Sequence, residues 1–477
     1  MKRTALLCSC IAFFFLPEMR SQVCSGLNFQ VLSEIPSDCG HMPLSLLHDQ
    51  LDRPFLYVAQ KEGGLRVLDI SDPEEPNPTQ GIEVSALGEL HVMNLFQAGN
   101  YLYLALGNHF GTAAQSSGMA IVDVSIPASP MLLDVWISPG PEGGAGIVLV
   151  EGDYAYLGAM GNGLFILDVS NPNEIEFISD FVPDIFYPDQ NPDSAKFNAR
   201  GMALRDQIVY LCYDAGGLRI INVSDKENPK ETGRYANPAL NGLPRAYNNI
   251  QVAGELAYIA VDYCGMEVLD ISDTSDITLH GWWNPWNCQT NPLNWFSSPG
   301  HANEISYDPG CELIYLSTGK SDLHVLDVSD PSQPDSCNFF GGVSNLQGSW
   351  GLGRYKQELY LTYICAVIPF FSNWTGVKIL SYDAPCTSAT VEEEPLPFSL
   401  APNPAAGLLT LRGLPENTAS KAEVFDLLGR RVPTNGHAEW NAGEFSLNIS
   451  GLSPGLYLLR VESGGKVYVA EFVKIRD

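Results

Sequence analysis

Positive charge is scarce in this sequence. Its 477 residues include 26 Lys and Arg against 55 Asp and Glu, which gives a formal net charge of −29. The imbalance is concentrated in residues 21–397, which hold 15 basic and 46 acidic side chains (net −31), whereas residues 398–477 hold eight of each. A body of that charge repels phosphate backbones and anionic bilayers. We therefore expect no nucleic-acid partner.

The sequence also has no apolar run long enough to span a bilayer. The stretch Ala5–Leu16 has twelve residues, where about 20 are needed. It follows two basic residues and ends at Pro17, which is the pattern of a secretory signal peptide over residues 1–21. Lipoprotein attachment at Cys8 or Cys10 is a weaker alternative, because the apolar run continues past both. We expect export and no transmembrane segment in the mature chain.

Several common site motifs are missing as well. The chain has no Cys-x-x-Cys, Walker or His-Glu-x-x-His motif, so zinc ribbons, thioredoxin-like chemistry and P-loop nucleotide sites have no support. Nine of the eleven Cys lie beyond the signal, and export permits them to form disulfides. Their odd number leaves at least one thiol that is unpaired or pairs between molecules. We expect that thiol to be Cys212, which fills an apolar slot inside a strand, and we expect no cofactor.

One phrase recurs seven times along the middle of the chain. The first copy reads Gly64-Leu-Arg-Val-Leu-Asp-Ile-Ser71, and later copies follow at intervals of 45 to 57 residues. The Asp slot is filled in turn by Asp69, Asp123, Asp168, Asn222, Asp270, Asp327 and Ser381. A Tyr followed by an aliphatic residue precedes each copy, at Tyr57, Tyr103, Tyr156, Tyr210, Tyr258, Tyr315 and Tyr360. Such self-similarity indicates a repeat architecture.

Each copy carries signals for four short strands separated by Gly-, Asp- and Pro-rich turns. Four strands in about 50 residues are typical of a propeller blade, whereas solenoid repeats, the runner-up, are usually shorter. The sequence therefore predicts an all-β fold, a seven-bladed β-propeller of four-stranded blades. The seventh copy lacks an outer strand, and we expect Phe29–Ile35 to supply it, because such closure hides strand edges.

The repeated unit resembles a known family. Gly-Leu-x-Ile/Val-Leu/Val-Asp-Val/Ile-Ser-Asp-Pro is similar to the LVIVD repeat of bacterial and archaeal surface or secreted β-propellers, over about Asp52–Asp383. The seventh copy departs most, since it loses the Asp. The resemblance implies a fold more than an activity. We interpret the Asp-x-Ser turn as structural, because its side chain can accept backbone hydrogen bonds and its spacing is not that of a calcium loop.

Insertions in the repeats fall on one side of the predicted ring. With strands named A to D from the axis outward, antiparallel connectivity puts B–C loops and D-to-A links on the same face, which we call the insertion-bearing face. The B–C loops of copies two and seven are long, and so are the links Pro183–Ala199, Ala236–Asn248 and Asn284–Asn303. Variable loops on a repeated scaffold are the natural place for function.

Aromatic residues are frequent in these insertions. They can stack on sugars or anchor peptides, or they can pack over one another and cap the ring. Our candidate ligand-binding residues are Phe110, Tyr187, Trp286, Trp295, Phe371 and Trp374. His41, His91 and His301 precede A strands and are weak candidates for a metal site at the channel mouth. The three histidines precede the repeated Tyr of their copies by different numbers of residues, which argues against their meeting at one site.

The C-terminal 80 residues lack the repeat. Five strand-like stretches predict a small β-sandwich. Its landmarks are Ala401-Pro-Asn-Pro404, Phe425-Asp-Leu-Leu-Gly-Arg430, Leu452-Ser-Pro-Gly-Leu-Tyr457 and Phe472-Val-Lys474. In that order they resemble the type A C-terminal sorting domain of the Bacteroidota type IX secretion system, over Phe398–Asp477. The resemblance implies a sorting motif that includes Pro402, Asn403, Pro404, Gly429, Arg430, Gly455, Tyr457 and Lys474.

The expected organisation is a signal peptide (1–21), a propeller (22–383), a linker (384–397) and a sorting sandwich (398–477). The resemblance implies the type IX machinery as a partner and a secreted or outer-surface location. Our leading hypothesis is a monomeric, non-catalytic module that binds a glycan, a peptide or an envelope protein through the insertion-bearing face. The alternatives are an extracellular hydrolase with its site at the channel mouth and a structural surface spacer.

Overall fold

The computed structural model of the chain consists of two compact units, Met1–Thr387 and Ser388–Asp477. In the first unit it describes residues 24, 27–108, 116–141, 143–290, 301–318, 322–367 and 370–383. In the second it describes 399–401, 403, 405–412, 419–425, 431–432, 439–441, 444–453, 455–463 and 466–475. Within these ranges, no helix is both long enough and apolar enough to cross a membrane.

The first unit contains seven four-stranded antiparallel sheets, six of which use consecutive strands. These six are β2–β5 (Ser45–His48, Phe55–Ala59, Leu65–Asp69, Asn77–Pro78), β6–β9 (His91–Ala98, Tyr101–Gly107, Ser116–Asp123, Met131–Pro141), β10–β13 (Ile147–Glu151, Tyr154–Gly158, Leu164–Asp168, Glu176–Phe181), β14–β17 (Gly201–Arg205, Ile208–Cys212, Leu218–Asn222, Lys230–Tyr235), β18–β21 (Ala246–Ala253, Leu256–Asp262, Gly265–Asp270, Thr278–Trp283) and β22–β25 (Ile305–Asp308, Leu313–Ser317, Leu323–Asp327, Asp335–Phe340).

The seventh sheet combines β26 (Ser349–Tyr355), β27 (Glu358–Tyr363), β30 (Gly376–Asp383) and β1 (Asn28–Pro36). The innermost strands contact one another in sequence around a ring, and β26 contacts β2 to close it. The predicted seven-bladed β-propeller is therefore confirmed. The described parts of the links also hold short 3-10 turns and a hairpin: η1 (Val84–Leu87), η2 (Ser194–Lys196), η3 (Pro238–Leu240), η6 (Val343–Asn345), β28 (Ala366–Val367) and β29 (Phe370–Phe371).

The hydrophobic core lies between neighbouring blades. Tyr57 and Val67 of the first blade, for example, pack in one cluster with Leu95 and Leu104 of the second. Successive side chains of a strand point to opposite faces of its sheet. A blade covered on both faces therefore needs apolar residues on both, which explains unbroken apolar runs such as Leu102–Leu106.

Backbone geometry explains the Gly that opens most copies of the repeated phrase. Gly64 and Gly217 have φ angles of 74° and 75°, in the left-handed region that favours glycine. A Cβ on Gly64 would lie 2.0 Å from the backbone oxygen of Ile82, and one on Gly217 would lie 2.1 Å from that of Tyr235. The third strand can start this close to the end of the fourth only if no side chain intervenes.

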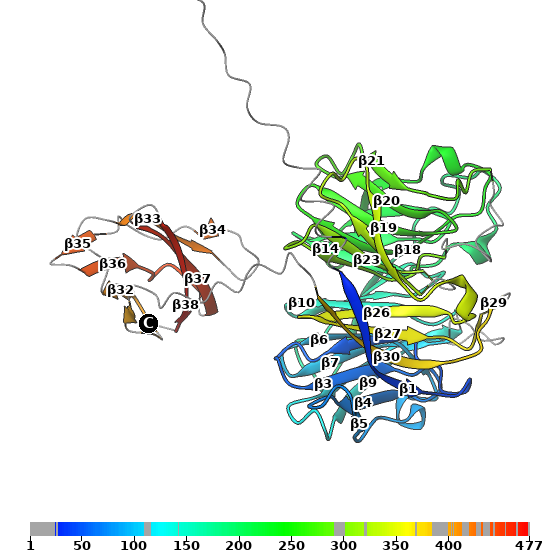
Figure 1. The fold of residues 1–477 in the computed structure, drawn as a ribbon, viewed down its shortest axis with the longest axis horizontal. Coiled ribbons are helices and arrows are strands. Elements are labelled where there is room, and N and C mark those ends of the chain that lie inside the picture. The colour runs from blue at the N-terminus through cyan, green and yellow to red at the C-terminus, as the bar shows by residue number, and fades with distance from the viewer. Residues whose placement is uncertain are drawn as a thin grey trace, which may run out of the picture. The chain divides into compact units, whose positions relative to one another are not determined.

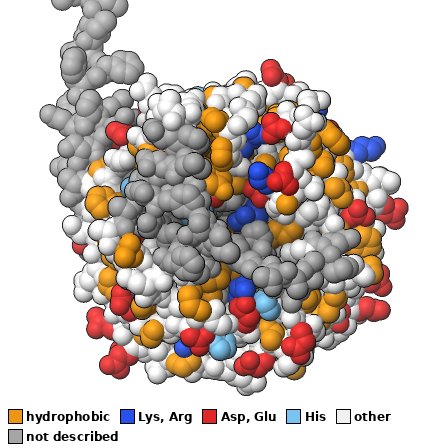
Figure 2. All heavy atoms as spheres, turned by 90° about the vertical axis from the view of Figure 1, so that its right-hand side faces the viewer, with side chains coloured by type: hydrophobic (Ala, Val, Ile, Leu, Met, Phe, Trp, Pro, Cys, Tyr) orange, Lys and Arg blue, Asp and Glu red, His pale blue; other side chains and the backbone are white. Residues whose placement is uncertain are grey.

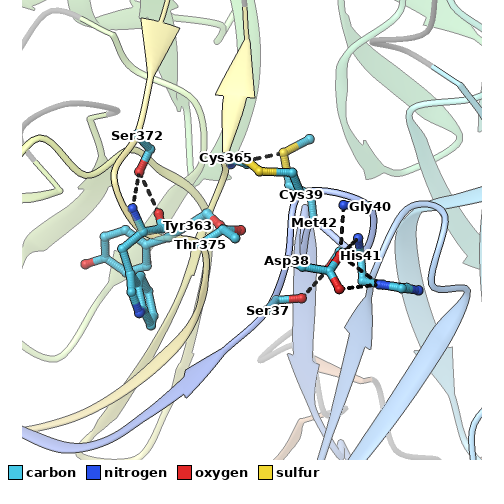
Figure 3. The surroundings of a disulfide bond; sticks show 11 residues. Ser37, Asp38, Cys39, Gly40, His41, Met42, Tyr363, Cys365, Ser372 and Thr375 are labelled. Atoms are coloured by element: carbon cyan, nitrogen blue, oxygen red, sulfur yellow. Dashed lines mark hydrogen bonds and ion pairs between the residues drawn. A yellow bond between two sulfur atoms is a disulfide. The ribbon is translucent and has the colours of Figure 1, made fainter.

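The N-terminal strand completes the seventh blade. β1 pairs with β30, from Asn28 opposite Asp383 to Pro36 opposite Gly376, and Figure 1 shows it beside β26, β27 and β30. Two disulfides flank this strand, Cys24–Cys337 and Cys39–Cys365, which join residues 313 and 326 positions apart. Figure 3 shows the second of them. We call these two disulfides the latches, since they tie the start of the ring to its last two blades.

The other described cysteines divide as the odd count suggests. Cys264 and Cys288 form a third disulfide, and Cys311 is also disulfide-bonded. Cys212 is free and buried in β15. The prediction that it is the unpaired thiol is confirmed.

The Asp slot of the repeat has the structural role that its spacing predicts. In six copies its side-chain oxygen accepts a hydrogen bond of 2.7–2.9 Å from the backbone N–H two residues later. The pairs are Asp69–Ser71, Asp123–Ser125, Asp168–Ser170, Asn222–Ser224, Asp270–Ser272 and Asp327–Ser329. These turns follow the third strand of each blade and lie opposite the insertion-bearing face. We call this second side the repeated face.

The second unit is a β-sandwich of two four-stranded sheets. One contains β31 (Ser399–Ala401), β32 (Leu408–Arg412), β36 (Glu444–Asn448) and β35 (Glu439–Asn441); the other contains β34 (Arg431–Val432), β33 (Ala419–Phe425), β37 (Gly455–Ser463) and β38 (Lys466–Lys474). Its core includes Leu409, Leu411, Val424, Leu459 and Phe472.

Several predicted sorting-motif residues meet on β37 and β38. Gly455 pairs with Lys474 across the two strands, and the Asn403 side chain accepts a hydrogen bond from the Val473 N–H (2.9 Å). The Tyr457 ring stacks on Phe472, and its hydroxyl donates to the Ser453 carbonyl (2.9 Å). These landmarks stabilise the sandwich at one end. Pro402, Pro404, Gly429 and Arg430 lie outside the described residues.

Candidate functional site at the channel mouth

The insertion-bearing face carries the long D-to-A links and the β28–β29 loop. Figure 2 views the molecule from this side, which is the right-hand side of Figure 1 where β29 lies, and acidic side chains are spread around its rim. A cavity of about 50 Å³ opens here. Its lining includes Leu44, Ser45, Met93, Asn94, Gly146, Met160, Arg200, Asn248, Asn249, Asn303, Glu304 and Trp350. Because these residues come from all seven blades, the cavity lies on the axis of the ring.

Charged side chains from neighbouring blades meet around this mouth. Arg200, Asp214, Asp262, His301 and Glu304 form what we call the channel-mouth cluster. His301 Nδ1 lies 2.6 Å from Asp262 Oδ1, and the Arg200 guanidinium lies 5.7 Å from the centre of the Trp350 ring. The positive charge of Arg200 acts on the carboxyls of Asp214 and Glu304. The first strands and the second-to-third-strand turns thus place ionisable groups on the axis.

Two carboxyls of the cluster have pKa values close to neutral. Burial raises the pKa of Glu304 to about 7, although Asn249 and Arg200 both favour its charged form. Burial also raises the pKa of Asp214 to about 6, against the effects of Arg200 and a hydrogen bond from the Asn198 side chain. A carboxyl with such a pKa can change its charge under mild conditions. Shifts of this kind are common at functional sites.

Amide side chains supply the remaining polar groups. Asn249 Nδ2 donates to both carboxylate oxygens of Glu304, at 2.6 and 2.5 Å. Asn248 Nδ2 donates to the Ala302 carbonyl (2.7 Å), while its Oδ1 is buried and accepts no hydrogen bond from any described residue. Buried acceptors without a donor are rare in native proteins. The mouth therefore has an acceptor to offer to a ligand that brings an N–H or O–H group.

Buried charges in the third strand anchor the insertions around the mouth. Arg219 is fully buried and donates to the carbonyls of Asp184 (2.8 Å) and Tyr187 (3.0 Å) in the link after blade three. Glu267 accepts a hydrogen bond from Asn237 Nδ2 in the link after blade four (2.7 Å) and another from the Tyr247 hydroxyl in β18 (2.7 Å). Burial raises the pKa of Glu267 to about 7. Each residue occupies the x position of the Gly-Leu-x phrase.

The third disulfide also holds an insertion. Cys264 lies in the turn after β19, and Cys288 lies in the link that follows β21. The Trp286 indole N–H donates to the Tyr263 carbonyl (3.0 Å), and its ring meets Trp283 edge-on with centroids 5.6 Å apart. The first part of this link is therefore fixed against the channel-mouth turn.

The three predicted aromatic ligand-binding residues with described side chains are half-buried and bonded to neighbours. Trp286 is held as above. Tyr187 lies between two guanidinium groups, 5.0 Å from Arg219 and 4.4 Å from Arg234, and its hydroxyl accepts from the Ala236 N–H (3.0 Å). Trp374 meets Tyr363 edge-on and lies 5.1 Å from Lys378 Nζ. These contacts give the three rings a packing role, and each keeps some exposed surface.

The remaining aromatic candidates give less information. Phe371 belongs to β29, but its side chain lies outside the described residues, as do Phe110 and Trp295 entirely.

The three histidines contact different carboxylates. His41 Nδ1 bonds to Asp38 (2.8 Å), as Figure 3 shows, and His91 Nδ1 lies 3.9 Å from Glu62. Only His301 belongs to the channel-mouth cluster. In the described part of the chain, no three His, Cys, Asp or Glu side chains form a group that could hold a metal ion.

The sequence analysis missed most of the channel-mouth cluster. Arg200 and Glu304 occupy the residue just before an inner strand, and Asp214 follows the second strand of blade four. In the sequence, each of these residues is a charged residue next to a short apolar strand. An alignment of the seven copies shows this pattern. Arg219 and Glu267 carried the same signal inside the repeated phrase.

Known families match both units of the chain. The model of the LVIVD repeat matches residues 54–80, 91–135, 142–181, 198–237, 244–284 and 313–337, which lie in the first six copies. A model described as the secretion system C-terminal sorting domain matches residues 399–475. No curated protein sequence matches the chain.

Solved propellers resemble the chain in fold. The RRP9 WD40 repeats share 11% identity at a TM-score of 0.51, over 75% of this chain and 98% of that one. The Cps50 (Swd1) propeller of Myceliophteria thermophila shares 12% at 0.50, over 74% and 99%. PorZ, a surface component of the type IX secretion system of Porphyromonas gingivalis, shares 12% at 0.43, over 89% and 64%. Such identities show the fold alone, and a TM-score of 0.43 supports no argument.

Proposed function

Because this chain is an LVIVD-repeat β-propeller protein with a type IX secretion sorting domain, and is thus secreted or held at the outer cell surface, we propose that its propeller is a binding module. The module acts without chemistry, as a monomer. Its ligand is a glycan, a peptide or an envelope protein, and a polar group of that ligand enters the channel mouth.

The channel-mouth cluster is the observation that carries this proposal. Arg200, Asp214 and Glu304 lie near the axis, and burial raises the pKa values of the two carboxyls. Burying charge costs free energy unless partners compensate for it. Arg219 and Glu267 offset this cost by anchoring insertions, whereas a binding site gives a reason for the buried carboxyls at the mouth, beside an Asn248 acceptor that no described residue pairs.

A matched pair of substitutions tests the proposal. The mature chain would be screened on arrays of glycans and peptides, and used to capture proteins from outer-membrane preparations. Glu304→Gln removes a charge at the mouth, and Glu74→Gln makes the same change in an exposed turn on the repeated face. We expect a ligand that binds wild type and E74Q alike but binds E304Q several-fold more weakly. The proposal would be contradicted if no ligand bound on the arrays or in the capture experiment, or if E304Q and E74Q lost affinity equally.

Hydrolysis of an extracellular polymer is the second candidate, and one observation favours it. Glu304 and Asp214, with pKa values of about 7 and 6, have the acidity expected of a general acid near neutral pH. The test is release of reducing ends or of free amines from a panel of polysaccharides and proteins. Turnover by wild type that disappears in both Glu304→Gln and Asp214→Asn would favour an enzyme over a binding module.

A further inference from the structure

A second cleft lies away from the axis, between the outer parts of blades two and three. It encloses about 540 Å³, a size within the range of roughly 300–1,000 Å³ found for ligand sites. Trp136 of β9 and Phe177 of β13 both line it and stack on each other, with ring centroids 5.9 Å apart and planes within 7° of parallel. Asn162, from the turn before β12, also lines it. The cleft therefore opens towards the insertion-bearing face.

The aromatic rings of the cleft are rigidly supported. Phe165 of β12 is buried and meets Trp136 edge-on at 90° and Phe177 at 88°, with centroids 5.9 and 5.7 Å away. Phe177 nevertheless keeps 46% of its surface exposed. A supported ring with an open face is suited to contact a ligand.

Polar groups without partners accompany these rings. The Trp136 indole N–H donates no hydrogen bond to any described residue, although its ring is half-buried. Asp180, also in the lining, is exposed and forms no ion pair or side-chain hydrogen bond within the described chain. The cleft thus offers apolar ring faces, one free donor and one free acceptor. A ligand that uses all of them must combine an apolar face with hydroxyl groups.

We propose that this cleft binds a sugar ring of a neutral glycan. The C–H face of the sugar packs on the exposed side of Phe177, against which Trp136 stacks, while one hydroxyl accepts from the Trp136 indole N–H and another donates to the Asp180 carboxylate. The net charge of −31 on residues 21–397 disfavours acidic polysaccharides. This site is separate from the channel mouth and does not depend on the function proposed there.

The probes are neutral oligosaccharides. Hexasaccharides of glucose, mannose, xylose and N-acetylglucosamine, with oligogalacturonate as an acidic comparison, would be titrated against the full mature chain by calorimetry. Phe177→Ala removes one ring, and Phe339→Ala is the matched control, since Phe339 also lies on an outer strand and is 59% exposed. We expect at least one neutral hexasaccharide to bind wild type and F339A equally, and to bind F177A about ten-fold more weakly.

Two further variants separate the parts of the site. Trp136→Phe keeps a ring but removes the N–H, so we expect it to weaken binding several-fold, with Trp136→Ala weakening it further. Glu304→Gln leaves this binding unchanged, so failure of the channel-mouth site and failure of the cleft are distinguishable. The proposal is overturned if no neutral hexasaccharide binds, if peptides bind the cleft instead, or if binding survives both W136A and F177A in proteins whose melting transition shows that they are folded.

Discussion

The two faces of the propeller are built on different principles. On the repeated face, six blades use the same turn, in which an Asp or Asn side chain accepts the N–H of the Ser two residues later. On the insertion-bearing face, the links differ in length, and three of them have anchors of different kinds: Arg219, Glu267 and the Cys264–Cys288 disulfide. The repeated face maintains the blade, whereas the insertion-bearing face is free to specialise.

Carboxyl groups on the two faces respond oppositely to their surroundings. Hydrogen bonds from Ser71 lower the pKa of the exposed Asp69, and the same is true of Asp123 with Ser125. Burial instead raises the pKa values of Asp214, Glu267 and Glu304 on the insertion-bearing face. The hydrogen bonds on the repeated face favour the charged carboxylate, whereas burial on the insertion-bearing face favours the neutral acid. The contrast supports a structural role for one face and a functional role for the other.

The largest effect should come from opening the ring. Replacing all four latch cysteines, Cys24, Cys337, Cys39 and Cys365, by Ser should lower the free energy of unfolding by about 5 kcal/mol, because each latch closes a loop of more than 300 residues. Removing one latch alone costs less, because the other still closes the ring. Urea unfolding of the mature chain measures this.

The matched control for the latches is the disulfide of the insertion. Replacing Cys264 and Cys288 by Ser opens a loop of only 24 residues and should cost about 3 kcal/mol. If both changes lowered the free energy of unfolding equally, the latches would not stabilise the protein by closing the ring.

The next largest effect concerns an insertion anchor. Arg219→Met keeps the volume of the side chain but leaves buried carbonyls and Glu231 without their partner. We expect the free energy of unfolding to fall by about 3 kcal/mol. We also expect proteases to cleave the link after blade three more readily. Arg66→Met changes the same slot of the first copy, where the guanidinium is half-buried and donates no hydrogen bond to a described residue, and should cost less than about 1 kcal/mol. If both variants lost the same free energy of unfolding, the hydrogen bonds of Arg219 to the link would not be the cause of the loss.

A smaller effect should appear as pH dependence. The folded-state pKa values of Glu304 and Glu267, about 7, exceed the ordinary glutamate pKa of 4.5 that applies to the unfolded chain. Between these values the folded chain binds more protons than the unfolded chain, so the stability that they contribute at low pH is lost as pH rises from about 4.5 to 7. Glu304→Gln should flatten this loss by about 1–2 kcal/mol in unfolding measured across that range.

The repeated face supplies the comparison for this pH dependence. A folded-state pKa below the unfolded value stabilises the protein above that unfolded value, and the effect is lost only in more acidic solution. Asp69→Asn should therefore leave the pH profile between 4.5 and 7 unchanged. A profile altered equally by E304Q and D69N would contradict the distinction between the faces.

The smallest effect is expected from a single repeated turn. Asp168→Ala removes one side-chain acceptor at an exposed turn and should cost about 0.5–1 kcal/mol, measured by thermal unfolding. Asp168→Asn should cost almost nothing, because Asn222 performs the same task in the fourth copy. A large loss in D168N would mean that the charge, and not the hydrogen bond, matters.

The repeat made most of the architecture predictable. A phrase copied seven times fixes the number of blades, and the position of Asp69 or Asp168 in it fixes a turn. Even the closing strand was visible, because the seventh copy lacks an outer strand and residues 28–36 supply one. Local patterns suffice here because each blade repeats the same local contacts.

The site was less predictable for a physical reason. Arg200 of blade four and Glu304 of blade six are far apart in sequence, and they line one cavity only because the ring brings the inner strands of their blades together. Tyr187 and Trp286 were predicted as candidate ligand-binding residues, yet both are partly used to hold their insertions. Whether an aromatic ring faces solvent or a neighbour depends on tertiary packing, which composition does not specify.

Hydrogen–deuterium exchange with and without the best ligand from the binding screens tests the central claim most directly. The account predicts slower exchange at and just before the starts of the inner strands, around 198–203, 246–250 and 301–306, and no change at the turns around Ser71, Ser170 and Ser329. Protection of those turns, with none at the channel mouth, would show that the repeated face is the one that binds.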